Sequence, residues 1–205
     1  MSIIFKRGSN IISVIFFCLF ATACTSHSTD TEIYRDPTLP FEKRVEDLLS
    51  RMTLEEKVAQ LTSTMEMLGF GSDAQKSFVD KEGNFLPERA AEIFRHGIGQ
   101  ISRPGGRRGG RRGPREMAEF TNMIQKWMLE NTRLGIPVMF HEEALHGLAC
   151  RGATSFPQAI ALSSTWNCDL VHKVFTATAL ETRSRGAQQV LSPVLDIVRD
   201  PRWGR

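Results

Sequence analysis

Two polar segments carry the residue types best suited to chemistry. The first is HEEALHG at residues 141–147, directly after the apolar run PVMF at 137–140. Its carboxylates and imidazoles can act as general acids or bases, bind sugar hydroxyls or hold a metal ion. The second is DIVRDPRWGR at residues 196–205, after the strand-like run 189–194. Residue type and position together make both segments candidates for a functional site.

The spacing within the first segment argues against a zinc site. A metalloprotease helix carries its two histidines at i and i+4, whereas His141 and His146 are five residues apart, about 140° around a helix. Glu142 and Glu143 could form a catalytic carboxylate pair, but adjacent residues at the end of a strand point to opposite faces. We therefore expect at most one glutamate to face a ligand. The alternative is that these side chains only cap helix ends and bind neighbouring backbone.

The second segment places three arginines, two aspartates and one tryptophan within ten residues. Guanidinium groups supply paired donors and an indole supplies an apolar face, a combination suited to holding sugar hydroxyls or an anionic group. The alternative is an internal ion-pair network, in which Asp196 or Asp200 pairs with Arg199, Arg202 or Arg205. Both can hold at once, because some of these groups must orient the others.

An arginine-rich stretch at residues 103–115 has six arginines in 13 residues, and the formal net charge of +3 comes entirely from it. It resembles an RGG-type nucleic-acid segment, but no aromatic residue is interleaved for base stacking. We expect a solvated loop and no nucleic-acid partner, with polyanion binding as the alternative.

Residues 1–23 have the features of a secretory signal peptide: two basic residues, an apolar run and small residues before Cys24. The sequence ATAC resembles a bacterial lipoprotein box, so we expect lipidation of Cys24. Ordinary cleavage is the alternative. Either predicts export to the periplasm or outer membrane, with a lipid anchor if Cys24 is modified. In an oxidising compartment Cys150 and Cys168 could pair, although two buried thiols are an equal alternative.

The rest of the chain must position these groups. Its 205 residues are 41% hydrophobic and 24% charged, an ordinary globular composition. Residues 24–40 read as a polar tether, and the folded domain is expected from residue 41 to 205. Thr53 to Glu56 is a capping box, and it opens a helix with an apolar stripe at Leu54, Val58, Leu61 and Met65.

Farther along, helices alternate with short apolar strands. Prolines 87, 114 and 157 are at expected helix starts, Asn167 or Asp169 caps a further helix, and strands are predicted at 98–101, 137–140 and 189–194. This α/β alternation is typical of a parallel sheet, either doubly wound or a (β/α)8 barrel. No G-x-G-x-x-G follows any strand, which favours the barrel. Its active site would lie at the carboxyl ends of the strands.

The chain resembles glycoside hydrolase family 3, the β-glucosidase and β-xylosidase group. The stretches that carry the resemblance are RVEDLLSRMTLEEKVAQL (44–61), NTRLGIPVMFHEEALHG (131–147), GATSFPQAIALSSTW (152–166) and VLSPVLDIVRDPRWGR (190–205). The resemblance implies a TIM-type barrel and retaining exo-hydrolysis of β-glucosides or β-xylosides. It implies that Glu143 and Arg205 hold the sugar, that His146, Arg199, Asp200, Arg202 and Trp203 support this loop region, and that no metal or cofactor takes part.

The same resemblance places the catalytic nucleophile and the acid/base after Arg205. About 165 residues remain for a barrel of about 250, enough for roughly the first three strand–helix units. We therefore expect a partial barrel that holds part of the sugar subsite and is inactive alone. The alternatives are a non-catalytic carbohydrate-binding protein of the cell envelope, and a polyanion-binding protein that uses the arginine-rich stretch.

Overall fold

The structure is a computed structural model, and it describes residues 31–65, 77–106 and 110–203. The expected signal peptide, Cys24 and Arg205 lie outside the described residues. None of the described helices combines the length and apolar character that a membrane span needs.

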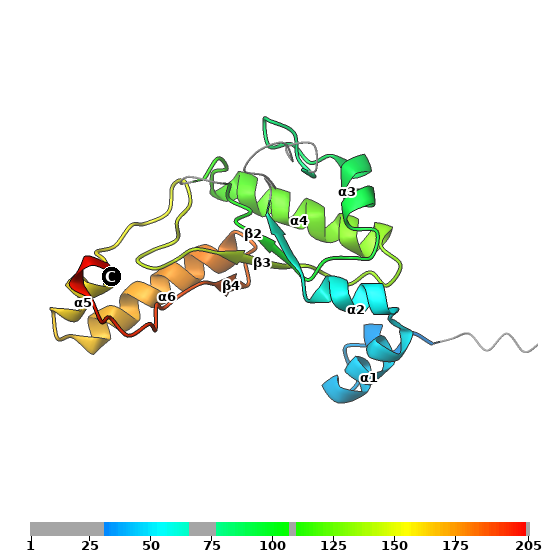
Figure 1. The fold of residues 1–205 in the computed structure, drawn as a ribbon, viewed down its shortest axis with the longest axis horizontal. Helices are drawn as coiled ribbons and strands as arrows, with labels where there is room; N and C mark the ends of the chain where they lie inside the picture. Colours follow the sequence, from blue (N-terminus) through cyan, green and yellow to red (C-terminus); the bar gives the residue numbers. More distant parts are fainter. Residues whose placement is uncertain (1–30, 66–76, 107–109, 204–205) are drawn as a thin grey trace, which may run out of the picture.

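Four parallel strands form a single sheet in the order β1-β2-β3-β4 (Figure 1). Their bounds are Ser63–Met65 (β1), Gln100–Ser102 (β2), Met139–Glu142 (β3) and Gln189–Val190 (β4). Strand order in space follows strand order in the chain, and helices connect the later strands. A doubly wound sheet would reverse its order at one point, whereas a barrel does not. The prediction of a partial TIM-type barrel is confirmed.

One strand is missing from the sequence prediction. The apolar stripe predicts a helix through Met65, but α2 ends at Gln60 and β1 begins at Ser63. Pairing with β2 decides this, because the backbone N–H of Gln100 donates to the carbonyl of Thr62 at 3.1 Å and the parallel ladder continues to Met65. The described chain thus holds four strands, one more than the three predicted.

The helices begin where local signals place them. They are α1 (Phe41–Arg51), α2 (Leu54–Gln60), α3 (Pro87–Ile93), α4 (Pro114–Asn131), α5 (Ala159–Ser163) and α6 (Cys168–Ser184), with 3-10 turns η1 (Ile33–Arg35) and η3 (Pro201–Trp203). The capping box is confirmed, since Thr53 Oγ1 accepts from the N–H of Glu56 at 3.2 Å and the Glu56 carboxylate accepts from the N–H of Thr53 at 2.9 Å. Asn167 is the cap of α6.

The hydrophobic core lies between the sheet and helices α3 and α4 (Figure 1). The predicted apolar face of α4 is buried there, including Met117, Ile124 and Met128. Ile101 of β2 and Phe140 of β3 occupy one row of the ladder, and both are fully buried in this core. Because side chains alternate along a strand, the neighbouring row, Ser102 and His141, faces the opposite side of the sheet.

The folded region begins earlier than expected. Tyr34 in η1 is buried, and its hydroxyl donates to the carbonyl of Leu134 at 2.8 Å. Its N–H donates to Asp47 of α1 at 3.0 Å. The last part of the predicted 24–40 tether is therefore packed against the domain, and folded structure starts before Phe41.

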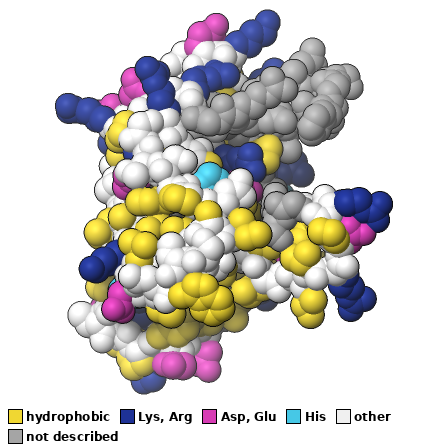
Figure 2. Space-filling view, turned by 90° about the vertical axis from the view of Figure 1, so that its left-hand side faces the viewer, with side chains coloured by type: hydrophobic (Ala, Val, Ile, Leu, Met, Phe, Trp, Pro, Cys, Tyr) yellow, Lys and Arg dark blue, Asp and Glu magenta, His cyan; other side chains and the backbone are white. Residues whose placement is uncertain are grey.

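Other apolar side chains are left uncovered by the described residues. The most exposed include Leu61 at 88%, Leu195 at 84% and Ile197 at 82%. Figure 2 looks at the end of the molecule that carries α5 and the C-terminal segment, and it shows hydrophobic side chains gathered across this face. The core between the sheet and the helices is thus buried, while several outer surfaces expose the large apolar side chains that usually lie in protein interiors.

Candidate functional site

The carboxyl ends of β2 and β3 bring two charged side chains together. Arg103 directly follows β2 and Glu143 directly follows β3. The Arg103 Nη2 group donates to Glu143 Oε1 at 2.8 Å, and the Arg103 N–H donates to the carbonyl of His141 at 2.8 Å. Both side chains keep contact with solvent, at 39% and 28% exposure. This pair, at the end of the sheet where barrels carry their chemistry, is the centre of the candidate site.

Glu142 lies on the other side of the same strand. Its side chain is 2% exposed, and its Oε1 accepts from the N–H of Gly105 at 2.8 Å. Burial raises the pKa of Glu142 above its ordinary value, while the N–H of Gly105 and the thiol of Cys150 partly oppose this rise. The prediction that the adjacent glutamates face opposite sides is confirmed. Glu143 is the one that reaches the strand-end surface.

Cys150 packs beside the Glu142 carboxylate. Burial, and then the charge of Glu142, raise the pKa of the Cys150 thiol to about 12. The structure holds Cys150 and Cys168 as free cysteines, the first buried and the second exposed. The disulfide between them is not formed, and the alternative of two buried thiols holds for Cys150 alone.

The described part of the arginine-rich stretch, residues 103–106 and 110–115, packs against the rest of the fold. Arg112 is 7% exposed, its Nη1 donates to the carbonyl of Pro104 at 2.8 Å, and its guanidinium lies over the Phe120 ring at 3.5 Å from the centroid. A Cβ on Gly105 would lie 2.5 Å from Cys150 Sγ, so only glycine allows this close approach. The solvated-loop prediction is wrong for Arg103 and Arg112, because both bind other parts of the fold.

The two histidines of the first segment have separate partners. His141 is buried, with its Nε2 at 3.3 Å from Ser63 Oγ, and burial lowers its pKa. His146 Nδ1 lies 2.9 Å from the carbonyl of Phe156. Within the described ranges, no group of three or more acidic, histidine or cysteine side chains is placed to hold a metal ion. The two histidines therefore lie in different surroundings and share no partner among the described residues.

The two candidate segments meet in one pocket of about 470 Å³. Leu145 and His146 line it from the first segment, and Asp196, Val198 and Trp203 line it from the second. A pocket of this size, mostly apolar with a few polar groups, suits a small ligand. The structure thus brings His146 and Trp203 together, as expected of neighbouring strand-end loops.

The remaining predicted residues are more exposed. Arg202 Nε donates to Asp200 Oδ1 at 2.9 Å, and this contact lowers the pKa of Asp200. The internal ion-pair alternative is therefore found for Asp200 and Arg202. Arg199 is exposed, and Arg205 lies outside the described residues.

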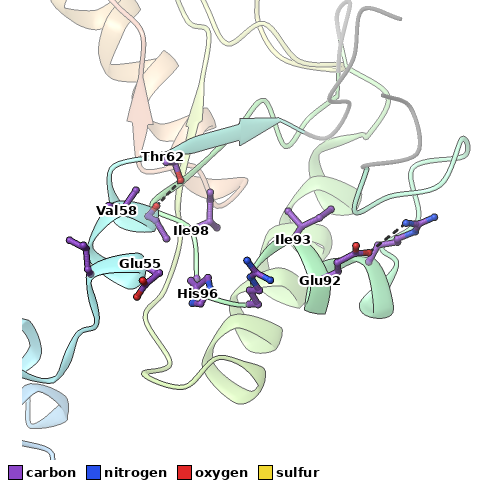
Figure 3. A pocket seen from close by; sticks show the side chains of 12 residues that line it. Glu55, Val58, Thr62, Glu92, Ile93, His96 and Ile98 are labelled. Atoms are coloured by element: carbon purple, nitrogen blue, oxygen red, sulfur yellow. Dashed lines mark hydrogen bonds and ion pairs between the residues drawn. The ribbon is translucent and has the colours of Figure 1, made fainter. Parts of the chain in front are cut away.

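A larger pocket of about 750 Å³ lies elsewhere, between α2 and α3 (Figure 3). Val58, Ile93, His96 and Ile98 are among the side chains that line it. These residues precede β1 and β2 in the chain, so the pocket is at the amino ends of those strands. Barrel enzymes use that end for stability and the opposite end for chemistry. Size alone therefore does not make this pocket the functional site.

Comparison with known proteins gives a consistent answer. A family model described as "Glycosyl hydrolase family 3 N terminal domain" matches residues 53–205. A Formosa agariphila protein named a β-xylosidase is 34% identical over 89% of this chain and 23% of its own length. The periplasmic β-glucosidase of Salmonella typhimurium is 30% identical over 78% of this chain and 17% of its own length.

Solved structures agree with these sequence relatives. A β-glucosidase from Erythrobacter marinus matches with a TM-score of 0.67 and 38% identity, covering 85% of this chain and 21% of that protein. The chain thus spans about a quarter or less of the length of these relatives.

The roles of Arg103 and Gly105 and the internal position of Glu142 were not predicted from the sequence. One positional signal was available, because Arg103 comes just after a predicted strand, where barrel loops carry site residues. The contact itself joins residues 40 apart in the chain. Only the strand register places them side by side.

Proposed function

Because the chain belongs to glycosyl hydrolase family 3, we propose that it supplies part of the sugar-binding subsite of an exported β-glucosidase or β-xylosidase. The observation that carries this proposal is the position of Glu143, at the carboxyl end of β3 with a partly exposed carboxylate. A carboxylate positioned beside the substrate can accept hydrogen bonds from two sugar hydroxyls, and such bonds help catalysis when they become stronger in the transition state.

In this proposal the chain binds and orients the sugar, and Arg205 takes part although it lies outside the described residues. Glu143 accepts hydroxyl hydrogen bonds, and Arg205 donates hydrogen bonds to the same sugar. His146 and Trp203 line the pocket in which the two candidate segments meet, and the ion pair of Asp200 with Arg202 orders the last described residues before Arg205. Retaining hydrolysis also needs a nucleophile and an acid/base whose carboxyl groups stand about 5 Å apart. We place both after Arg205, on the resemblance to the family.

Export is part of the same proposal. The signal-like residues 1–23 support it, and so does the periplasmic location in the name of the Salmonella relative. We propose that Cys24 becomes the lipidated first residue of the mature chain, and that residues 41–205 belong to the barrel domain. Mass spectrometry of the mature amino terminus tests this. A diacylated Cys24 supports the anchor, whereas an unmodified terminus after residue 23 contradicts it.

The activity is tested by comparing two polypeptides. The product of the complete reading frame should hydrolyse nitrophenyl β-glucoside or β-xyloside, while residues 24–205 alone should show no turnover. In the active product, Glu143→Ala should lower kcat/KM by about 10- to 100-fold, since hydrogen bonds to a charged group contribute about 1.5–3 kcal/mol. Exposed Glu119→Ala on α4 is the matched control. Robust turnover by residues 24–205, or an unchanged kcat/KM in Glu143→Ala, would contradict the assignment.

A further inference from the structure

We propose that Arg103 is a second sugar-recognition residue of this subsite and that Arg103 and Glu143 act as one neutral unit suited to uncharged β-glycosides. The inference rests on the proposed function and extends it to a residue and a substrate class. It starts from the contact between Arg103 Nη2 and Glu143 Oε1 at 2.8 Å.

The contact leaves binding capacity on both partners. Glu143 uses Oε1, and no described residue donates to its Oε2. A guanidinium has five N–H donors in a planar fork, and no described acceptor other than Glu143 contacts the Arg103 side chain. With 39% of the Arg103 side chain and 28% of that of Glu143 exposed, a ligand at the strand ends can reach both groups. Together they present donors and an acceptor, which is what a sugar diol requires.

The backbone around Arg103 shows that the side chain is held in place. Arg103 has φ of 54°, in the left-handed region that non-glycine residues rarely adopt. Such conformations persist where the surroundings fix them, and they are enriched at functional sites. Here the N–H of Arg103 donates to His141, and the carbonyl of Arg103 accepts from the N–H of Gly106 at 2.9 Å. The turn therefore directs the guanidinium toward the end of β3.

The two glutamates at the end of β3, Glu142 in the strand and Glu143 just after it, fix this turn from opposite sides. Glu142 binds the N–H of Gly105 below the sheet end, and Glu143 binds the Arg103 side chain above it. A substrate thus meets a preorganised pair, which lowers the cost of ordering flexible side chains on binding.

Charge determines the substrate class. Arg103 and Glu143 offset each other's charge, so the pair has no net charge with which to attract a charged sugar. A uronide carboxylate at this position would be repelled by Glu143 and would compete with it for the N–H donors of Arg103. The hydroxyls of a neutral glucoside or xyloside can instead donate to the free Oε2 of Glu143 and accept from the free N–H groups of Arg103. We therefore expect neutral β-glycosides to be preferred over β-glucuronides.

The test uses the product of the complete reading frame and three variants. Arg103→Met removes the donors, and we expect kcat/KM for nitrophenyl β-glucoside or β-xyloside to fall about 10- to 100-fold. Arg103→Lys keeps the charge without the fork and should recover part of this loss. Arg115→Met is the matched control, because Arg115 lies in the same stretch but its side chain is 90% exposed and pairs with Glu119; its kcat/KM should not change.

A double-mutant cycle tests whether Arg103 and Glu143 act as one unit. If Arg103 acts together with Glu143, Arg103→Met combined with Glu143→Gln should lower kcat/KM by less than the product of the two single effects. Independent effects that multiply would overturn the proposal, as would full activity in Arg103→Met or faster hydrolysis of nitrophenyl β-glucuronide than of the glucoside. Loss with Glu143→Ala but not with Arg103→Met rejects this inference alone. A wild-type product without glycosidase activity rejects the proposed function and this inference with it.

Discussion

Glu142 is an ionisable residue held almost wholly out of water at the end of β3. Its neighbours are the N–H of Gly105 and the thiol of Cys150, and no arginine or lysine forms an ion pair with it among the described residues. Burial therefore raises the pKa of Glu142. A carboxyl group in this setting contributes shape and hydrogen bonding, and its charge is a cost to the folded state.

This environment gives a prediction about pH. The folded chain holds the Glu142 proton more tightly than the unfolded chain does. Its contribution to the free energy of unfolding is thus largest at low pH and declines as pH rises from the ordinary glutamate pKa of about 4.3 through the raised folded-state pKa. Glu142→Gln keeps an acceptor for Gly105 and cannot ionise. Relative to wild type, the variant should therefore become more stable as pH rises through this window.

Urea unfolding of wild type and variant at a series of pH values measures this difference. Glu119→Gln, on the exposed face of α4, controls for the substitution itself. A stability difference between Glu142→Gln and wild type that stays constant from acidic to neutral pH would show that Glu142 is not desolvated as described.

At the scale of elements, the start of α2 combines a local cap with a tertiary contact. Thr53 and Glu56 satisfy each other's backbone N–H groups, and Arg133 Nε also donates to Glu56 Oε1 at 2.8 Å. Thr53→Ala should lower the free energy of unfolding by about 1 kcal/mol, the usual effect of losing an N-cap. Glu56→Ala should cost more, because it also leaves Arg133 without its carboxylate. Chemical denaturation measures both variants.

The control for this prediction is Lys57→Ala, an exposed substitution on the same helix that should change stability by less than about 0.5 kcal/mol. Equal effects of Thr53→Ala and Lys57→Ala would mean that the cap does not stabilise α2. The pKa of Glu56 is lowered, mainly by the hydrogen bond from Arg133. The stabilisation that Glu56 gives to the folded state should therefore decrease as pH falls through that lowered pKa.

The elements differ in how far the sequence could predict them. The starts of α2, α3 and α4 depend on residues at the start of each helix, namely the Thr53 cap, Pro87 and Pro114, so sequence reasoning finds them. Strand β1 has three residues whose structure depends on pairing with Gln100–Ser102. An apolar residue at helical spacing, Met65, was therefore assigned to the wrong element. Propensity is a weak guide where non-local hydrogen bonds decide.

The same distinction applies to the candidate site. The position of Glu143 and its opposition to Glu142 follow from alternation along one strand, which is local information. The pairing of Glu143 with Arg103 joins two strand ends through their register, and the composition around Arg103 indicated a solvated loop instead. Arg112 shows the same effect, because its burial depends on a contact with Phe120 of α4. The residue types could be read from the sequence, but the contacts between residues far apart in the chain could not be predicted from it.

At the scale of the molecule, the described residues bury one face of the sheet under helices but leave strand edges and apolar side chains uncovered. The core between the sheet and helices α3 and α4 is closed, yet β1 and β4 each have only one strand partner among the described residues. Leu54 and Val58 of α2 and Leu61 just after it form an apolar stripe, and all three are exposed. The apolar stripe of a helix normally packs against a core. These exposed surfaces are therefore what is expected of part of a barrel wall whose neighbouring strand–helix units would cover them.

This arrangement predicts the behaviour of residues 31–205 expressed alone. The exposed apolar side chains, and the edges of β1 and β4 that no described strand pairs, should make the polypeptide bind the dye ANS and self-associate at micromolar concentration. Replacing Leu61, Leu195 and Ile197 by lysine should lower dye binding, because these side chains are among the most exposed apolar groups. Lysine at exposed Arg199 is the matched control and should leave dye binding unchanged. Sedimentation velocity measures the association, and a monodisperse monomer without ANS fluorescence would mean that the open surfaces are covered within residues 31–205.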